Sequence, residues 1–171
     1  MMKNIFSGLI LMGFVSMAHA ENTAAVNKSS CNQVANTTKP FILVLDKGDD
    51  LLESITQCVK DAKLKSAAFG GIGQVHEPVL AYFTSNPNDK PTLKKFSGYY
   101  ELASIKGDVT LNGDQYYSHA HVVLADKNFN GIAGHLAKSK VGLTAEITVI
   151  PLPEVVERTV DQKTGFGPIV H

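Results

Sequence analysis

The chain has 171 residues, of which 16 are Lys or Arg and 16 are Asp or Glu, so that its formal net charge is zero. DNA-binding proteins neutralise phosphates with basic side chains and read bases best with the forked guanidinium of arginine. The only arginine is Arg158. The composition therefore speaks against a DNA-binding surface, although a local cluster such as Lys94 and Lys95 is compatible with a neutral chain.

Residues 1–20, MMKNIFSGLILMGFVSMAHA, have the pattern of a secretory signal peptide. Lys3 precedes a mostly apolar stretch from Ile5 to Val15, and the segment ends in Ala-His-Ala, a small-residue cleavage pattern. A membrane anchor is the alternative, but the apolar stretch is shorter than the ~20 residues that span a bilayer. We therefore expect cleavage after Ala20, export to the periplasm or the medium, and no stable membrane insertion of the mature chain.

Cys31 and Cys58 are the two cysteines of the chain. An oxidising compartment permits a disulfide between them, which would fasten the N-terminal segment to the body of the protein. Alternatively, Cys58 is a small buried apolar residue and Cys31 is a free thiol, and the sequence leaves both interpretations open. Neither cysteine belongs to a CxxC pair, so a thioredoxin-type or thiolate-zinc site has no support.

The first half of the mature chain predicts a strand and a helix after a polar lead-in. Residues 21–38 are small and polar without periodicity, which predicts a flexible segment before a domain that spans residues 39–171. The apolar run PFILVL, residues 40–45, is typical of a strand covered on both faces. In residues 49–64 the apolar positions share one helical face, and Asp50 with Glu53 has the spacing of a capping box.

The second half reads as a succession of strands. SAAFGGIG, residues 66–73, predicts a strand that enters a tight glycine turn, because the segment lacks the third glycine and the following helix of a phosphate-binding loop. Residues 154–168 follow two strand-ending prolines and can add an edge strand and a turn. The order of elements predicts a single compact α+β domain with a mainly antiparallel sheet. The further expected strands are residues 78–83, 100–111, 117–125, 131–136 and 142–150.

Three histidines fall close together in this pattern. Side chains alternate along a strand, so His119 and His121 project to the same side, with Cα atoms about 7 Å apart. The turn-forming residues DKNFNG, 126–131, fold the chain back and set His135 opposite residue 121 or 122. Since a slip of one residue would point His135 to the other face, the cluster depends on the register of this hairpin.

Three neutral imidazoles with an open fourth position are the ligand set of catalytic zinc sites, where the free position holds water or substrate. Nitrogen ligands also admit other divalent metals, so zinc is a preference. The alternative is a hairpin with hydrogen-bonded or surface histidines that bind no metal. On spacing alone, the sequence leaves both open.

Several segments together resemble the PPC domain, the plants-and-prokaryotes conserved domain that also occurs beside AT-hooks in plant nuclear proteins. The segments are AAFGGIGQV, VLAYF, YELASIKGDVTL, HAHVVLAD, GIAGHL, TAEITVI and ERTVDQKTGFGP, and they extend from about Pro40 to Pro168. The resemblance implies a compact α+β subunit with an antiparallel sheet flanked by helices, which assembles as a homotrimer. The sequence has no Arg-Gly-Arg-Pro hook, so that the DNA-binding label attached to plant members rests on the family alone.

The implied fold is similar to that of acetolactate decarboxylase and of a zinc-dependent ester hydrolase, which hold zinc with a His-x-His pair and one later histidine. Carried over, this pattern falls on His119, His121 and His135. Glu101 and Glu146 are candidate catalytic residues, as partners of a histidine or as proton carriers, although strand glutamates usually face solvent. We expect an exported metal-binding module for a small, unidentified ligand; the alternatives are a zinc-dependent lyase or hydrolase, and a DNA-binding protein.

Overall fold

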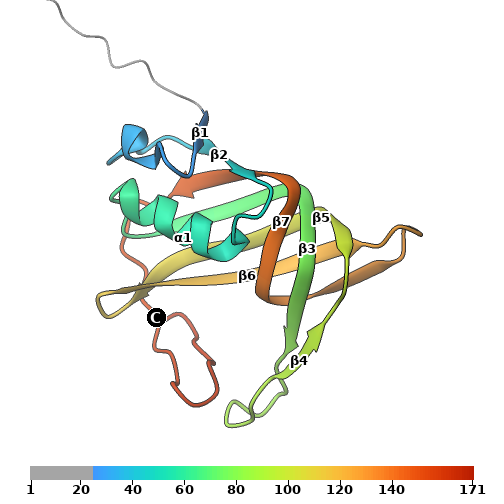
Figure 1. Cartoon of the computed structure of the whole chain (residues 1–171). Helices are drawn as coiled ribbons and strands as arrows, with labels where there is room; N and C mark the ends of the chain where they lie inside the picture. The colour runs from blue at the N-terminus through green and yellow to red at the C-terminus, as the bar shows by residue number, and fades with distance from the viewer. Residues whose placement is uncertain (1–24) are drawn as a thin grey trace, which may run out of the picture.

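Strands dominate the structure, a computed structural model that describes residues 25–171 (Figure 1). The predicted signal peptide, residues 1–20, lies outside the described residues. The helical elements are α1 (Leu51–Asp61) and the short 3-10 helix η1 (Cys31–Val34). The strands are β1 (Ala25–Asn27), β2 (Phe41–Asp46), β3 (Ala67–Tyr82), β4 (Thr92–Lys95), β5 (Tyr99–Asn112), β6 (Gln115–Ala125) and β7 (Gly131–Pro151).

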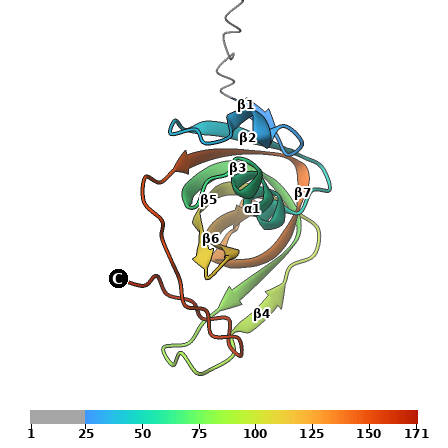
Figure 2. The same cartoon turned by 90° about the vertical axis from the view of Figure 1, so that its left-hand side faces the viewer.

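The sheet closes on itself. Its strand order is β1-β2-β7-β6-β5-β3-β4, and β7 also pairs with β3, so that β7, β6, β5 and β3 form a ring. All pairings between these four strands are antiparallel, as predicted, and only β1 with β2 is parallel among the named strands. In Figure 2 the strands of the ring curve around α1, which lies at the near end of the ring. The inward-facing aliphatic side chains of the ring and of α1 form one continuous core.

Helix α1 begins and packs as its sequence pattern predicts. The Asp50 side chain accepts a hydrogen bond from the backbone N–H of Glu53 at 3.2 Å, which satisfies one of the free donors of the first turn. Leu51, Ile55 and Val59 recur at helical spacing and are completely buried. Burial of this face against the sheet supplies most of the stability of an 11-residue helix, which would be marginal in isolation.

Two expected boundaries were wrong. The segments predicted as separate strands at 131–136 and 142–150 are one strand, β7, and those at 66–73 and 78–83 are one strand, β3. The Gly71–Gly73 stretch is a bulge in the pairing of β3 and not a turn that ends the strand. Glycine is required there because a Cβ on Gly71 would lie 2.3 Å from the backbone oxygen of Glu146.

The expectation of flanking helices is also corrected, since α1 is the only α-helix among residues 25–171. A sheet that closes into a ring covers much of its own inner face, so one helix at the open end completes the core. No helix in this part of the chain is long and apolar enough to cross a membrane.

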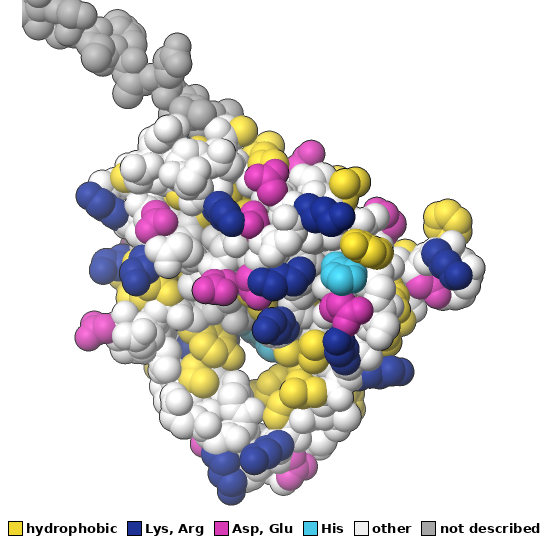
Figure 3. Space-filling view, in the orientation of Figure 1, with side chains coloured by type: hydrophobic (Ala, Val, Ile, Leu, Met, Phe, Trp, Pro, Cys, Tyr) yellow, Lys and Arg dark blue, Asp and Glu magenta, His cyan; other side chains and the backbone are white. Residues whose placement is uncertain are grey.

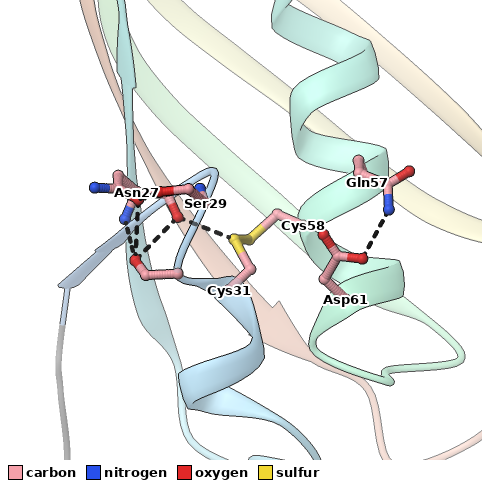
Figure 4. Close-up of a disulfide and its surroundings, with 7 residues drawn as sticks. Asn27, Ser29, Cys31, Gln57, Cys58 and Asp61 are labelled. Carbon is pink, nitrogen blue, oxygen red and sulfur yellow. Dashed lines mark hydrogen bonds between the residues drawn. A yellow bond between two sulfur atoms is a disulfide. The ribbon is translucent and has the colours of Figure 1, made fainter.

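The segment 21–38, expected to be flexible, contains regular structure from Ala25 onward. β1 pairs with β2, and η1 buries Cys31 and Val34. The structure contains a disulfide between Cys31 and Cys58, which joins η1 to α1 (Figure 4). The polar composition of the segment misled the prediction because the bridge and two buried apolar side chains hold it against the domain.

Candidate metal centre

The three histidines meet where β6 pairs with β7. His119 and His121 lie on the same side of β6, two residues apart, as strand alternation predicts. His135 lies on β7 directly opposite His121 in the antiparallel register. Of the two registers considered from the sequence, the hairpin adopts the one with His135 opposite residue 121, and the predicted cluster of imidazoles is confirmed.

The hairpin turn holds this register through one aspartate. The Asp126 carboxylate accepts hydrogen bonds from the backbone N–H groups of Asn128 at 2.8 Å and Asn130 at 2.9 Å. The Asn130 side chain donates to its other oxygen at 3.1 Å. Phe129, between the two asparagines, adopts a positive φ of 64°. These bonds define how many residues the turn contains, and therefore which residue of β7 faces His121.

The spacing of the imidazoles fits a single metal ion. Their ring centroids lie 5.0 to 5.5 Å apart, and one ring nitrogen from each lies within 4.8 Å of the other two. Nitrogens around a tetrahedral zinc are about 3.4 Å apart, because each Zn–N bond is about 2.0–2.1 Å. Side-chain rotations within a rotamer well would have to bring the nitrogens closer together around an ion, whereas the backbone already places all three imidazoles on one side of the hairpin.

The electrostatics keep at least two of these imidazoles neutral and able to bind metal. Burial, with smaller contributions from the neighbouring His119 and His121, lowers the pKa of His135 to about 4. Burial also lowers the pKa of His119, with a smaller contribution from the positive charge of Arg158. Neutral imidazole is the form that coordinates a metal ion, so protons compete weakly with the metal at pH 7.

The histidines form the base of a hollow of about 400 Å³. One wall comes from the end of β3 and the residues after it, including Phe83, whose ring meets that of His135 edge-on at 5.2 Å. The opposite wall comes from the C-terminal segment, with Phe166 and Pro168. In Figure 3 hydrophobic side chains border a hollow in the lower half of the face shown, with histidine atoms at its upper edge.

Arg158 and Tyr117 complete this hollow, and neither was identified as a site residue from the sequence. The Arg158 side chain is buried and donates to both oxygens of Asp108, each at 2.9 Å. Asp108 lies opposite His119 in the pairing of β5 with β6. Tyr117, two residues before His119, donates its hydroxyl hydrogen to the carbonyl of Gly165 at 3.2 Å. Strand alternation alone would have placed Tyr117 beside the histidines; the location of Arg158 required the tertiary fold.

Gly107 on the neighbouring strand β5 allows β6 to lie close to β5 at His119. A Cβ on Gly107 would lie 2.2 Å from the carbonyl oxygen of His119 and 2.7 Å from the ring of Phe69. Both distances are far below van der Waals contact, so a side chain at this position would displace the strand that carries two of the three histidines.

The two predicted acids lie elsewhere. Glu101 accepts a hydrogen bond from the Gln74 side chain at 3.0 Å. Glu101 and Glu146 together line a second hollow of about 400 Å³, next to the Gly73 bulge, which shares no lining residue with the histidine hollow. The expectation that they border the histidines is therefore corrected: both face away from the ring interior, on a stretch where the bulge had made the register unpredictable.

Solved structures of three proteins share this fold. A plant- and prokaryote-conserved (PPC) protein from Pyrococcus horikoshii is 26% identical, with a TM-score of 0.68 over 78% of this chain and 93% of that chain. A protein from Ralstonia eutropha JMP134, described as a candidate DNA-binding protein, is 28% identical, with a TM-score of 0.69 over 80% and 94%. A metal-containing protein from Archaeoglobus fulgidus is 26% identical, with a TM-score of 0.68 over 78% and 94%.

No curated protein matches the sequence significantly. Residues 32–153, which include α1, the ring of strands and all three clustered histidines, match the Plants and Prokaryotes Conserved (PCC) domain. The match confirms the resemblance noted in the sequence. The chain therefore belongs to the Plants and Prokaryotes Conserved domain family.

Proposed function

We propose that this protein is an exported, homotrimeric module that binds a divalent metal, zinc by preference, through His119, His121 and His135. The metal in turn holds a small anionic or carbonyl-bearing ligand, which the protein binds without chemical conversion. The observation that carries this proposal is the convergence of three imidazoles, two of them with lowered pKa, at the base of a walled hollow.

The ligand set favours zinc over harder ions. Imidazole nitrogens suit zinc, copper, iron and nickel, whereas magnesium and calcium require oxygen ligands. When bound by three histidines, the ion supplies a Lewis-acid position for a ligand oxygen. The relative from Archaeoglobus fulgidus, which is described as metal-containing, supports a metal in this family member as well.

Binding without turnover is favoured over a lyase or hydrolase by the lining of the hollow. A metal-dependent enzyme needs a proton carrier within hydrogen-bond reach of the reacting group. No Asp, Glu or Lys belongs to the described residues that line the histidine hollow. Burial raises the pKa of Tyr117, and its hydroxyl is engaged with Gly165, so this phenol is a poor base at neutral pH.

Export is supported by the signal-peptide pattern of residues 1–20 and by the disulfide. Disulfides persist in oxidising compartments such as the periplasm and the extracellular space and are rare in the cytosol of most organisms. The Cys31–Cys58 bridge is buried on both sides, as expected for a structural disulfide.

Assembly of copies of the chain is supported by apolar side chains on the outer surface of the ring. Ile42, Ile72 and Ile150 are 41%, 58% and 44% exposed and line one shallow hollow over β2, β3 and β7. Exposed apolar side chains gathered in one hollow, here beside Lys106 and Glu146, are typical of protein interfaces. The homotrimer implied by the family resemblance would cover it.

DNA binding, the activity named for the relative from Ralstonia eutropha, is not favoured here. Arg158, the only arginine, is buried in its contact with Asp108 and cannot reach a phosphate. Lysines and acidic side chains are interspersed over the face shown in Figure 3, without a basic stripe on that face.

The metal content of the purified protein tests this proposal. Mature protein prepared without a histidine tag or chelators is expected to carry about one divalent ion per subunit by elemental mass spectrometry. His121→Ala is expected to lose it. His76→Ala is the matched control, because His76 stacks on Tyr99 at 4.3 Å and lies outside the cluster. A metal-free wild type, or equal loss in both variants, would contradict the proposal.

A further inference from the structure

We propose that the C-terminal segment, residues 157–168, makes the histidine hollow selective for small carboxylates that carry an apolar group, preferably an aromatic ring. The inference deepens the function proposed above and rests on it. It names the chemical class of the ligand and assigns Phe166 as a residue that determines specificity.

The segment is held firmly enough to act as a wall. Besides its two bonds to Asp108, Arg158 donates through Nε to the Thr110 hydroxyl at 3.0 Å and through Nη1 to the carbonyl of Gly167 at 2.5 Å. The backbone N–H of Asp161 donates to the carbonyl of Phe166 at 2.8 Å. Arg158 thus connects both arms of a folded-back loop to β5, and the position of Phe166 relative to the histidines is defined by the fold.

The far end of the loop is fastened separately. The Asp161 carboxylate accepts hydrogen bonds from the backbone N–H of Thr164 at 2.8 Å and of Lys163 at 3.0 Å. Gly165 has a φ of +75°, a conformation that L side chains rarely adopt, and its carbonyl accepts the Tyr117 hydroxyl. These hydrogen bonds fix the position of Gly165, and therefore of the adjacent Phe166, in the wall of the hollow.

The walls are apolar on both sides of the histidines. Phe83 and Ala81 come from one side and Phe166 and Pro168 from the other. Phe166 is 41% exposed although it belongs to this wall, so its ring has surface left to contact a bound group. A hollow of about 400 Å³ accommodates a single phenyl ring with a short carboxylate arm.

The charges at the base favour one negative group. Imidazole ligands add no negative charge to a bound divalent ion, and the lining of the hollow contains no Asp or Glu to offset the charge of that ion. The charge of Arg158 is offset by Asp108, and its donors are engaged within the fold. A carboxylate has two oxygens to satisfy, whereas a phosphate has more and would find few free donors in this lining.

Calorimetric titration of the metal-loaded protein at pH 7 tests the inference with three probes: phenylacetate, acetate and the neutral phenylacetamide. Phenylacetate is expected to bind at least about tenfold more tightly than acetate, because burial of a phenyl ring adds at least that much affinity. Phenylacetamide is expected to bind at least about tenfold more weakly than phenylacetate, because it lacks the negative charge of the carboxylate.

Phe166→Ala is expected to reduce the preference for phenylacetate over acetate by about fivefold, with both ligands titrated into the same metal-loaded sample. Phe129→Ala is the matched control, since Phe129 is 89% exposed at the β6–β7 turn and does not line the hollow. The ligand assignment alone would be overturned if phenylacetate bound no more tightly than acetate, or if phenylacetamide bound as tightly as phenylacetate. An unchanged preference in Phe166→Ala would overturn it as well. A wild type that retains no metal would overturn both this inference and the function on which it rests.

Discussion

Reduction of the Cys31–Cys58 disulfide is expected to lower the free energy of unfolding by about 3.5 kcal/mol. The bridge joins residues separated by 27 positions and closes a loop that contains β2 and most of α1. For a loop of this size, the chain-entropy relation gives about 12 cal/mol/K, which corresponds to about 3.5 kcal/mol at room temperature. For a chain of this length, that loss shifts the melting temperature downward by about 7 to 14 °C.

Urea denaturation of the mature protein, with and without a phosphine reductant, measures this loss. The double variant Cys31→Ala/Cys58→Ala is expected to unfold at the lower urea concentration and to be insensitive to reductant, because it has no bridge to break. Metal content is expected to be the same in all samples, since the bridge joins η1 to α1 and the three histidines lie on β6 and β7.

A loss of less than about 1 kcal/mol on reduction, in oxidised protein shown by thiol titration to have no free cysteine, would contradict this prediction. It would mean that closing the loop restricts the unfolded chain far less than the chain-entropy relation requires.

Three further changes are expected to have defined outcomes. Gly107→Ala should destabilise the protein by about 3 kcal/mol in urea denaturation and lower its affinity in metal titrations, because the added Cβ would lie 2.2 Å from the His119 carbonyl oxygen. Gly131→Ala is the control, and it should change neither stability nor metal affinity, because nothing lies within 4 Å of its added Cβ. In metal-free protein, the lowered pKa of His135 means that the unfolded state binds a proton at a higher pH than the folded state does. The contribution of His135 to the free energy of unfolding should therefore be complete above pH 6.5 and be lost as the pH falls toward 4. His135→Gln should flatten this dependence in urea denaturation, and a variant with the wild-type pH profile would contradict it. Analytical ultracentrifugation of the wild type should give a mass about three times that of the subunit, and Ile72→Lys should lower this mass toward that of a single subunit. A wild-type monomer at micromolar concentration would contradict the proposed trimer.

The local signals in the sequence accounted for much of the fold. The helical spacing of Leu51, Ile55 and Val59 and the cap at Asp50 predicted α1, and apolar runs predicted most of the strands. Strand boundaries failed where a strand crosses from one partner to another. β7 pairs with β6, β3 and β2 along its length, and residues 137–141, which separated the two predicted strands, lie within this one long strand.

The candidate site was predictable to the extent that it depended on one hairpin. His119 and His121 required only alternation, and His135 required the turn at Asp126, so short-range rules reached all three. The walls of the hollow depend on contacts between residues 50 positions apart, such as Arg158 with Asp108, for which no periodicity exists. Glu101 and Glu146 were misplaced because their strand partners lie far from the histidines. Glu101 pairs with Ala125, four positions beyond His121 on β6, and Glu146 pairs with Ile72 on β3 and Val44 on β2.

The most direct test of the metal site is a crystal structure of the untagged mature protein with diffraction recorded above and below the zinc absorption edge. One anomalous peak per subunit is expected at the point where the imidazoles of His119, His121 and His135 converge. The peak is expected to be lost in His135→Ala. An anomalous map without a peak there, from crystals grown in the presence of zinc, would contradict the account.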